Sequence, residues 1–233
     1  MSKHYSVLLN ESIDNLNIKE DGIYVDCTLG YAGHSSQILK RITRGCLFAF
    51  DQDGEAITYS RKILDQISNN YEIINSNFVN IKEELNKRGI TKVNGILFDL
   101  GVSSPQLDEA ERGFSFHNDA KLDMRMNQGA AVDAASVVNT YDVSSLASVF
   151  SRYGELRNAM SIADAITMAR EVKPIETTGE LKSAVARFLP KGSENKVLAQ
   201  IFQALRIEVN EEMKVLEAFL GQCADVLNPG GRL

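Results

Sequence analysis

Hydrophobic residues in the first part of the chain occur in short continuous runs that alternate with stretches of helical spacing. Runs bounded by turn residues predict four strands, at 22–27, 46–50, 71–74 and 95–100. Apolar positions three and four apart predict helices between them, over 35–42, over 56–67 and around 81–85. Strands that alternate with helices in this way predict an α/β fold, with a doubly wound parallel sheet covered on both faces.

The pattern changes after Gly101. Residues 102–141 are rich in Gly, Asp, Asn and Ser and show little periodicity, and stripes of helical spacing follow over 162–169 and 181–189. We therefore expect a mostly helical domain inserted over residues 105–195.

A long helical region begins near Asn195 and runs to Leu227, with a break near Asn210. We expect this region to return to the sheet. The core domain would then be discontinuous and consist of residues 1–104 and 196–233.

The sequence Asn228-Pro229-Gly230-Gly231 has the chemistry that ends helices, and only Arg232 and Leu233 follow it. It resembles the lead-in to a fifth strand. A parallel sheet without that strand would expose an apolar face and an unpaired edge. We therefore expect the C-terminal strands to be missing and the chain to be part of a longer protein.

Composition and charge limit the class of protein. No apolar run approaches the roughly 20 residues that cross a bilayer, and the N-terminus does not resemble a signal peptide, so we expect a cytoplasmic protein without membrane contact. The three cysteines lie far apart, and with three histidines no metal-ligand spacing occurs, so no metal is predicted.

The formal net charge of −6 argues mildly against a protein that coats nucleic acid. A local basic patch is still possible. Residues 182–200 contain Lys182, Arg187, Lys191 and Lys196, and Glu194 is their only acid. A solvated helix face would explain the same pattern.

Candidate chemistry lies where the predicted strands end, because parallel sheets bind ligands beyond their carboxyl ends. The segment from Asp26 to Ser35 follows the first strand, and its Gly30 and Gly33 would let a ligand approach the backbone closely. Taken alone this glycine turn is a weak signal, because many strand-to-helix turns use glycine.

Asp51 ends the second strand, where a carboxylate can accept hydrogen bonds from both hydroxyls of a ribose. The alternative is an aspartate that caps the following helix. The glycine turn and this acid together favour a nucleoside cofactor, but they do not separate NAD from S-adenosylmethionine.

The segment from Asp99 to Gln106 begins at the end of the fourth strand. Asp99 could hold an adenine or an amino group, and Asp99, Ser103 and Ser104 are the catalytic candidates of this loop. Read without further context, a turn with serine and proline is an ordinary loop.

Two further segments combine aromatic and basic residues, 111–116 and 122–126. The side chains that could stack a base or hold a phosphate are Arg112, Phe114, Phe116 and Arg125. A packed loop with internal ion pairs would have the same composition.

Taken together, these segments resemble the ribosomal RNA small subunit methyltransferase H (MraW-type) family. The resembling stretches occur in the family's order over nearly the whole chain and are 4–9, 26–35, 99–106, 111–116, 122–126 and 202–210. The resemblance implies a class I, Rossmann-like methyltransferase that uses S-adenosyl-L-methionine. It further implies N4-methylation of a cytidine in the decoding region of bacterial small-subunit (16S) ribosomal RNA, and it leaves open a homodimer and whether the substrate is the assembled subunit.

The resemblance also implies the cofactor contacts, which fall on Ala32, Gly33, His34, Asp51, Phe78, Asp99 and Gln106. Asp51 suits the ribose hydroxyls and Phe78 suits the face of the adenine. The sequence departs from the family's pattern at two positions. Tyr31 replaces a smaller or different residue, and Gln200 stands where many relatives carry a basic residue. No general base is assigned.

Two other classes stay open. A nicotinamide-dependent oxidoreductase would share the glycine turn and Asp51, although the insert fits it poorly. A non-catalytic RNA-binding or assembly factor would share the RNA-facing features without methyl transfer.

Overall fold

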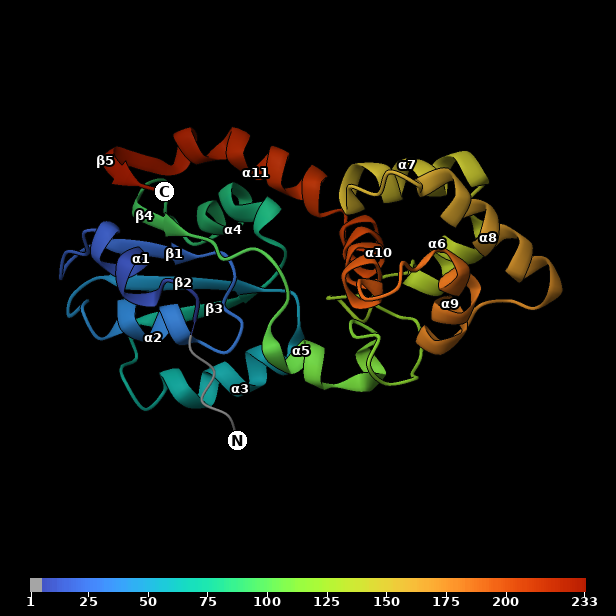
Figure 1. Ribbon diagram of the computed structural model, residues 1–233. Coiled ribbons are helices and arrows are strands. Elements are labelled where there is room, and N and C mark those ends of the chain that lie inside the picture. Colours follow the sequence, from blue (N-terminus) through green and yellow to red (C-terminus); the bar gives the residue numbers. More distant parts are fainter. Residues whose placement is uncertain (1–5) are drawn as a thin grey trace. The chain divides into compact units, whose positions relative to one another are not determined.

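In the computed structural model of the chain, residues 6–233 are described, without the side chain of Ser104 (Figure 1). A five-stranded parallel sheet has the order β3-β2-β1-β4-β5. Its strands are β1 (Ile23–Asp26), β2 (Cys46–Asp51), β3 (Tyr71–Asn75), β4 (Val93–Leu97) and β5 (Leu227–Arg232). The chain moves outward from β1 to β3 and then returns to place β4 on the other side of β1. The predicted doubly wound α/β fold is therefore confirmed.

Helices cover both faces of this sheet because successive strand residues point to opposite sides. Tyr24 packs on one face with residues of α1 (Leu9–Asn15), α2 (Gly33–Leu39) and α3 (Gly54–Leu64). Val25 packs on the other with residues of α4 (Ile81–Lys87), which follows the 3-10 helix η1 (Phe78–Asn80), and of α11 (Glu212–Val226). The strands are apolar on both sides, as a sheet buried on two faces requires.

The chain divides into two compact units, residues 1–103 with 214–233 and residues 104–213. We call them the sheet unit and the helical unit. The helical unit contains α5 (Ser104–Asp108), η2 (Ala110–Arg112), α6 (Ala134–Thr140), α7 (Val143–Gly154), α8 (Ala159–Val172), α9 (Thr178–Val185), η3 (Ala186–Phe188) and α10 (Glu194–Val209).

The second boundary differs from the one expected from sequence. We expected residues from 196 onward to belong to the sheet domain, but α10 lies in the helical unit. The reason is its buried face, which includes Leu198, Ile201 and Leu205 and packs mainly against α7. The helical break near Asn210 is confirmed, since α10 ends at Val209 and α11 begins at Glu212.

The fifth strand also differs from expectation. Residues 228–231, predicted to stop the helix and lead into a later strand, are themselves part of β5, which begins at Leu227. The pairing with β4 is irregular, with Val93 opposite Leu227 and Gly95 opposite Arg232. Pro229 fits such a strand only where its missing N–H is not needed by the ladder.

Three features expected from the sequence remain: part of the family resemblance, the lack of a membrane span and the lack of a metal site. His4 and Tyr5, which belong to the family resemblance, lie outside the described residues. Among residues 6–233, no helix is long and apolar enough to span a membrane. The same residues contain no cluster of His, Cys, Asp and Glu suited to a metal ion.

Candidate functional site

The glycine turn after β1 is hydrogen-bonded to both neighbouring strands. The amide of Cys27 donates to the carbonyl of Leu97 in β4 at 2.8 Å, and the amide of Leu29 donates to that of Phe50 in β2 at 2.9 Å. Gly30 has a φ of 48°, in the left-handed region that glycine adopts without strain. The turn is thus held at the point where the strand order reverses, which is where ligands of such sheets bind.

Asp26 fastens the turn to the helix that follows. Its carboxylate accepts a hydrogen bond from the amide of Thr28 at 3.1 Å and one from the hydroxyl of Ser35 in α2 at 2.6 Å. The side chain is buried, and burial raises its pKa even though these hydrogen bonds act to lower it. This role of Asp26 could not be predicted from the sequence, because its spacing from Ser35 carries no signal by itself.

Asp51 reaches across to the same turn from the end of β2. One carboxylate oxygen accepts from the amide of Gly30 at 2.8 Å and the other from the amide of Asp53 at 2.9 Å. Burial raises the pKa of Asp51 to about 6, despite these two bonds. The cap of α3 is a different residue, Asp53, which accepts from the amide of Glu55 at 3.1 Å. The alternative explanation of Asp51 as a helix cap is therefore wrong.

The three predicted contacts of residues 32–34 lie at the start of α2. Ala32 has a φ of 62° and is buried. A Cβ on Gly33 would lie 1.9 Å from the hydroxyl oxygen of Ser6, so a larger residue there would require that side chain to move. His34 is 6% exposed, and its Nε2 has no hydrogen-bond partner among the described residues. A buried nitrogen of this kind is normally satisfied, so His34 is suited to meet a ligand.

Phe78 and Asp99 follow the carboxyl ends of β3 and β4. Phe78 packs edge-on against Phe219, with 5.0 Å between ring centroids, which fixes the orientation of its ring. Asp99 is exposed, and its amide donates to the hydroxyl of Thr28 in the glycine turn at 2.7 Å. The sheet unit therefore brings six of the seven predicted contacts to the ends of its first four strands.

The remaining candidates of this group are placed differently. Gln106 is buried in α5 of the helical unit. Ser103 is half-buried at the end of the sheet unit's first part. The side chain of Ser104 lies outside the description. The roles of these residues stay predictions.

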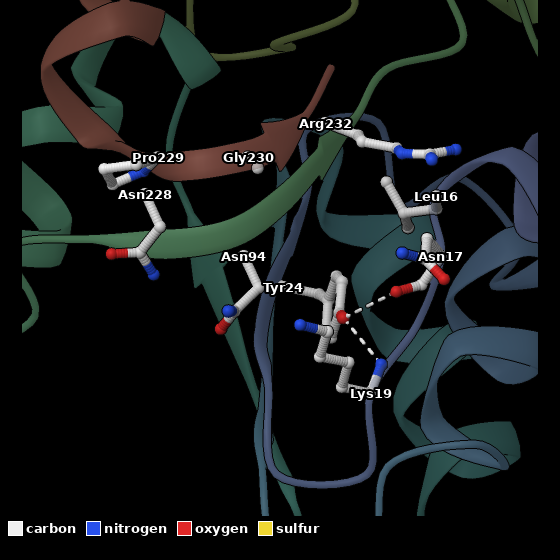
Figure 2. Close-up of a pocket in the computed structure, with 10 residues that line it drawn as sticks. Leu16, Asn17, Lys19, Tyr24, Asn94, Asn228, Pro229, Gly230 and Arg232 are labelled. Carbon is white, nitrogen blue, oxygen red and sulfur yellow. Dashed lines mark hydrogen bonds between the residues drawn. The ribbon is translucent and has the colours of Figure 1, made fainter.

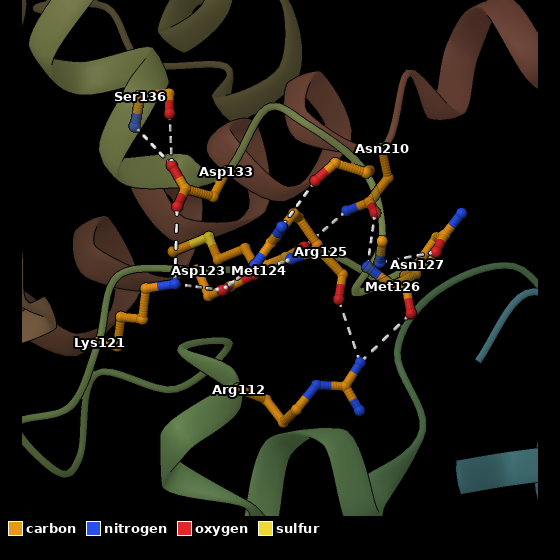
Figure 3. Close-up of polar contacts among 12 residues, drawn as sticks. Arg112, Lys121, Asp123, Met124, Arg125, Met126, Asn127, Asp133, Ser136 and Asn210 are labelled. Carbon is orange, nitrogen blue, oxygen red and sulfur yellow. Dashed lines mark hydrogen bonds and ion pairs between the residues drawn. The ribbon is translucent and has the colours of Figure 1, made fainter. Parts of the chain in front are cut away.

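The aromatic and basic candidates of the helical unit belong largely to an internal network, which Figure 3 shows. Both Nε and Nη2 of Arg125 donate to the carboxylate of Asp123 at 2.7 Å. Partial burial would raise the pKa of Asp123, but hydrogen bonds from Arg125 and Lys121 lower it to about 2. Arg112 is buried, and its Nη2 donates to the carbonyl of Arg125 at 3.1 Å.

The same network is anchored to the end of α10. Asn210 accepts from the amide of Met126 and donates to the carbonyl of Met124, each at 2.8 Å (Figure 3). Phe114 is buried, with the guanidinium of Arg112 at 5.7 Å from its ring centre. These contacts favour the packed-loop alternative for Arg112, Phe114 and Arg125.

Phe116 differs from these three because it is half-buried. Its ring lies 5.4 Å from that of Phe202 in α10 and 4.8 Å from that of His117. Part of its surface is therefore accessible, and its role as a stacking residue stays a prediction.

A small polar cavity lies at the opposite edge of the sheet, near the starts of β1 and β4 (Figure 2). Its walls include Asn17, Lys19 and Tyr24, and the hydroxyl of Tyr24 accepts from the amide of Lys19 at 2.8 Å. The lining also includes residues 228–232 of β5. None of the predicted site residues lines it, so this cavity is separate from the strand-end site.

A doubly wound sheet with a glycine turn, a buried acid after the second strand and an aromatic after the third defines the class of α/β proteins that bind nucleoside cofactors. The chain belongs to the MraW methylase family, whose model matches residues 1–233. This membership confirms the resemblance seen in the sequence. The chain is thus a methyltransferase that uses S-adenosylmethionine, and not a nicotinamide-dependent oxidoreductase.

Similar curated proteins carry one name. A protein of Exiguobacterium sibiricum named ribosomal RNA small subunit methyltransferase H is 50% identical, over 100% of this chain and 76% of its own length. A protein of Christiangramia forsetii with the same name is 51% identical, over 100% and 76%. Among solved structures, an rRNA methylase from Streptococcus thermophilus is 18% identical with a TM-score of 0.35, covering 52% of this chain and 70% of its own. A structural likeness this low adds nothing to the assignment.

Proposed function

We propose that the protein transfers the methyl group of S-adenosylmethionine to N4 of a cytidine in the decoding region of bacterial small-subunit ribosomal RNA. The observation that supports this proposal is the identity of about half over the whole chain with relatives named for methylation of that RNA. The nucleotide and the atom follow from the family resemblance of the sequence. Small-subunit ribosomal RNA is thus the partner that we propose.

The residues at the strand ends suit this cofactor. Asp51 offers an ionisable carboxylate for the ribose hydroxyls, and His34 offers a buried nitrogen that lacks a protein partner among the described residues. Phe78, held edge-on by Phe219, offers an aromatic surface for the adenine. When bound, S-adenosylmethionine supplies a methyl group on a positively charged sulfur.

The protein's contribution to the reaction is mainly alignment. Holding the accepting nitrogen in line with the methyl group can lower the barrier by several kcal/mol. The turn is suited to this because Asp26 ties it to α2 and Thr28 ties it to the backbone of Asp99.

A proton acceptor near the amino group would further assist the reaction. The lone pair of cytosine N4 is delocalised into the ring, so an oxygen that accepts a hydrogen bond from the amino group would favour the reactive geometry. We propose the exposed carboxylate of Asp99 for this role. Because Asp99 is also a predicted cofactor contact, an Asp99→Asn variant should lower kcat by a larger factor than it raises the cofactor dissociation constant.

The proposed function is tested by incubating the protein with radiolabelled S-adenosylmethionine and either free small-subunit ribosomal RNA or small subunits. Digestion and mass spectrometry should then find one N4-methylcytidine in the decoding region. RNA in which that cytidine is replaced by uridine is the matched control and should remain unlabelled. Label on another nucleotide or atom would contradict the proposed target, and cofactor binding without any transfer would favour a non-catalytic RNA-binding role.

A further inference from the structure

One stretch of the helical unit, residues 182–196, concentrates positive charge in a chain whose net charge is −6. It runs from α9 through η3 and a turn into α10 (Figure 1). It contains Lys182, Arg187, Lys191 and Lys196, with Glu194 as its single acid. We call it the basic segment. An acidic protein that binds RNA needs such a local surface, because its overall charge repels phosphate.

The four cations of the basic segment are accessible. All four residues are exposed, and within the described part of the chain none of them forms an ion pair. Arg187 lies over the half-buried ring of Phe188, with its guanidinium carbon 4.8 Å from the ring centre. This stacking orients the guanidinium and leaves its N–H groups unpaired by a carboxylate.

The helical unit has eight other cations. Two of these, Arg152 and Arg157, are exposed and form no ion pair among the described residues. The other six donate to protein oxygens: Arg112, Lys121, Arg125, Arg170, Lys173 and Arg206. Arg170, for example, donates to the carbonyl of Val138 at 2.7 Å, and Arg206 pairs with Glu212 at 2.8 Å. The contrast indicates that the charges of the basic segment do not stabilise the fold.

The start of α9, the helix that carries Lys182, is well fixed. Thr177 and Glu180 form a capping box at the start of α9. The hydroxyl of Thr178 donates to the carbonyl of Asn118 at 2.8 Å, and the amide of Gly179 donates to Asp119 at 2.8 Å. A surface fixed in this way loses little conformational entropy when it binds a partner.

We infer that the basic segment is a phosphate-contacting surface for the RNA substrate. This inference rests on the proposed function, which names RNA as the substrate. Lysine and arginine side chains that neutralise phosphates release the condensed counterions of the RNA, so their contribution is strongest at low salt. The segment contributes affinity and orientation rather than recognition of the target base.

The test compares a variant with all four cations changed to alanine (Lys182→Ala, Arg187→Ala, Lys191→Ala, Lys196→Ala) with the unchanged protein. Its affinity for small-subunit ribosomal RNA should fall at least about tenfold, and the slope of log affinity against log salt should decrease by about 2 to 3. Affinity for S-adenosylmethionine, measured by calorimetry, and thermal unfolding, followed by circular dichroism, should both stay the same and thereby show that both units are folded.

Two controls sharpen the result. The first control removes four positive charges from the sheet unit. It changes to alanine four residues that are exposed near the amino ends of the strands: Lys19, Lys40, Arg44 and Lys62. It should keep its RNA affinity and its salt slope. Replacing the three lysines of the basic segment by arginine should preserve binding within about twofold, because the charges remain.

The possible results separate this inference from the proposed function. Equal RNA affinity and salt slope in the four-alanine variant and the unchanged protein would overturn the inference, while methylation of the RNA by both would leave the proposed function standing. Equal losses in the sheet-unit control would also overturn it, since only total charge would then matter. An unchanged protein that neither binds nor methylates the RNA would overturn the proposed function itself.

Discussion

The strand-end site of the sheet unit and the loop network of the helical unit each contain a partly or fully buried aspartate, but the pKa values of the two aspartates change in opposite directions. Asp51 accepts two backbone hydrogen bonds and still has its pKa raised to about 6 by burial. Asp123 is also partly buried, but bonds from Arg125 and Lys121 lower its pKa to about 2. At Asp123 the hydrogen bonds from two cations outweigh partial burial, whereas at Asp51 the bonds from backbone amides do not outweigh deeper burial.

This comparison separates two uses of a carboxylate. In the loop network each charge is matched within the protein, so the network stabilises the fold and offers little to a ligand. Among the described residues at the strand ends, Asp51 has no cation partner and Nε2 of His34 has no hydrogen-bond partner. Groups left in this state indicate binding rather than stability.

The largest expected effect is on cofactor binding by an Asp51→Ala variant. Removing the acceptor for two ribose hydroxyls should weaken binding of S-adenosylmethionine at least about 100-fold, or about 3 kcal/mol for two hydrogen bonds to a charged group. The free energy of unfolding should change by less than about 1 kcal/mol, because the variant also loses an unfavourably buried charge. Calorimetric titration and urea unfolding measure the two quantities, and an unchanged dissociation constant would refute the assigned role.

The second-largest expected effect is on stability and not on cofactor binding, and it concerns an Asp123→Asn variant. It removes the ion-pair partner of Arg125 and should destabilise the protein by about 2 kcal/mol, because folding lowers the pKa of Asp123 from 3.8 to about 2. The affinity for S-adenosylmethionine should not change. Urea unfolding at neutral pH is the measurement. A loss of cofactor affinity without a loss of stability would show that Asp123 serves ligand binding and not the stability of the fold.

The smallest effect is the dependence on pH. Since the folded pKa of Asp51 is raised to about 6, cofactor binding that needs its ionised form should weaken about tenfold between pH 7 and pH 5. The stability contribution of Asp51 has the opposite sign: burial of its charge destabilises the fold as pH rises from about 4 through 6. An Asp51→Asn variant is the control and should bind weakly with little dependence on pH over this range.

The stability contribution of Asp123 falls in a different window. Its folded pKa is lowered from 3.8 to about 2, so its contribution is complete above pH 3.8 and is lost as the pH falls towards 2. A titration of cofactor affinity at pH 5 to 7 therefore probes the strand-end site without breaking the loop network. Affinity that is flat over that range would contradict the role of Asp51 as an ionised acceptor.

Much of the sheet unit could be predicted from the sequence because its strands are short apolar runs that end in polar residues, such as Asp26 and Asp51. The spacing of apolar residues and the order of the strands along the chain can both be read from the sequence. They suffice to place the carboxyl ends of the parallel strands on the same side of the sheet. The helix α1 was not predicted, because Leu8, its cap, is in the left-handed region and makes no side-chain hydrogen bond. No capping signal marks the start of that helix.

The sequence was less informative where packing between distant segments decides the outcome. The apolar stripe of α10 shows that one face is buried but not that α7 covers it, so the boundary at residue 196 was wrong. The same holds for the site: the hydrogen bond between Asp26 and Ser35 depends on the shape of the glycine turn. Arg112 and Arg125 likewise suited a ligand or a packed loop equally well until their partners were known.

The bonds that tie the glycine turn to β2 and β4 have a consequence for the kinetics of the enzyme. The amides of Cys27 and Leu29 extend the hydrogen bonding of the sheet, so this part of the turn cannot open without breaking its hydrogen bonds to β4 and β2. Its mobility before binding is thereby coupled to the cooperative unfolding of the strands rather than to that of a free loop. We therefore expect cofactor association to need no slow closing step at this turn.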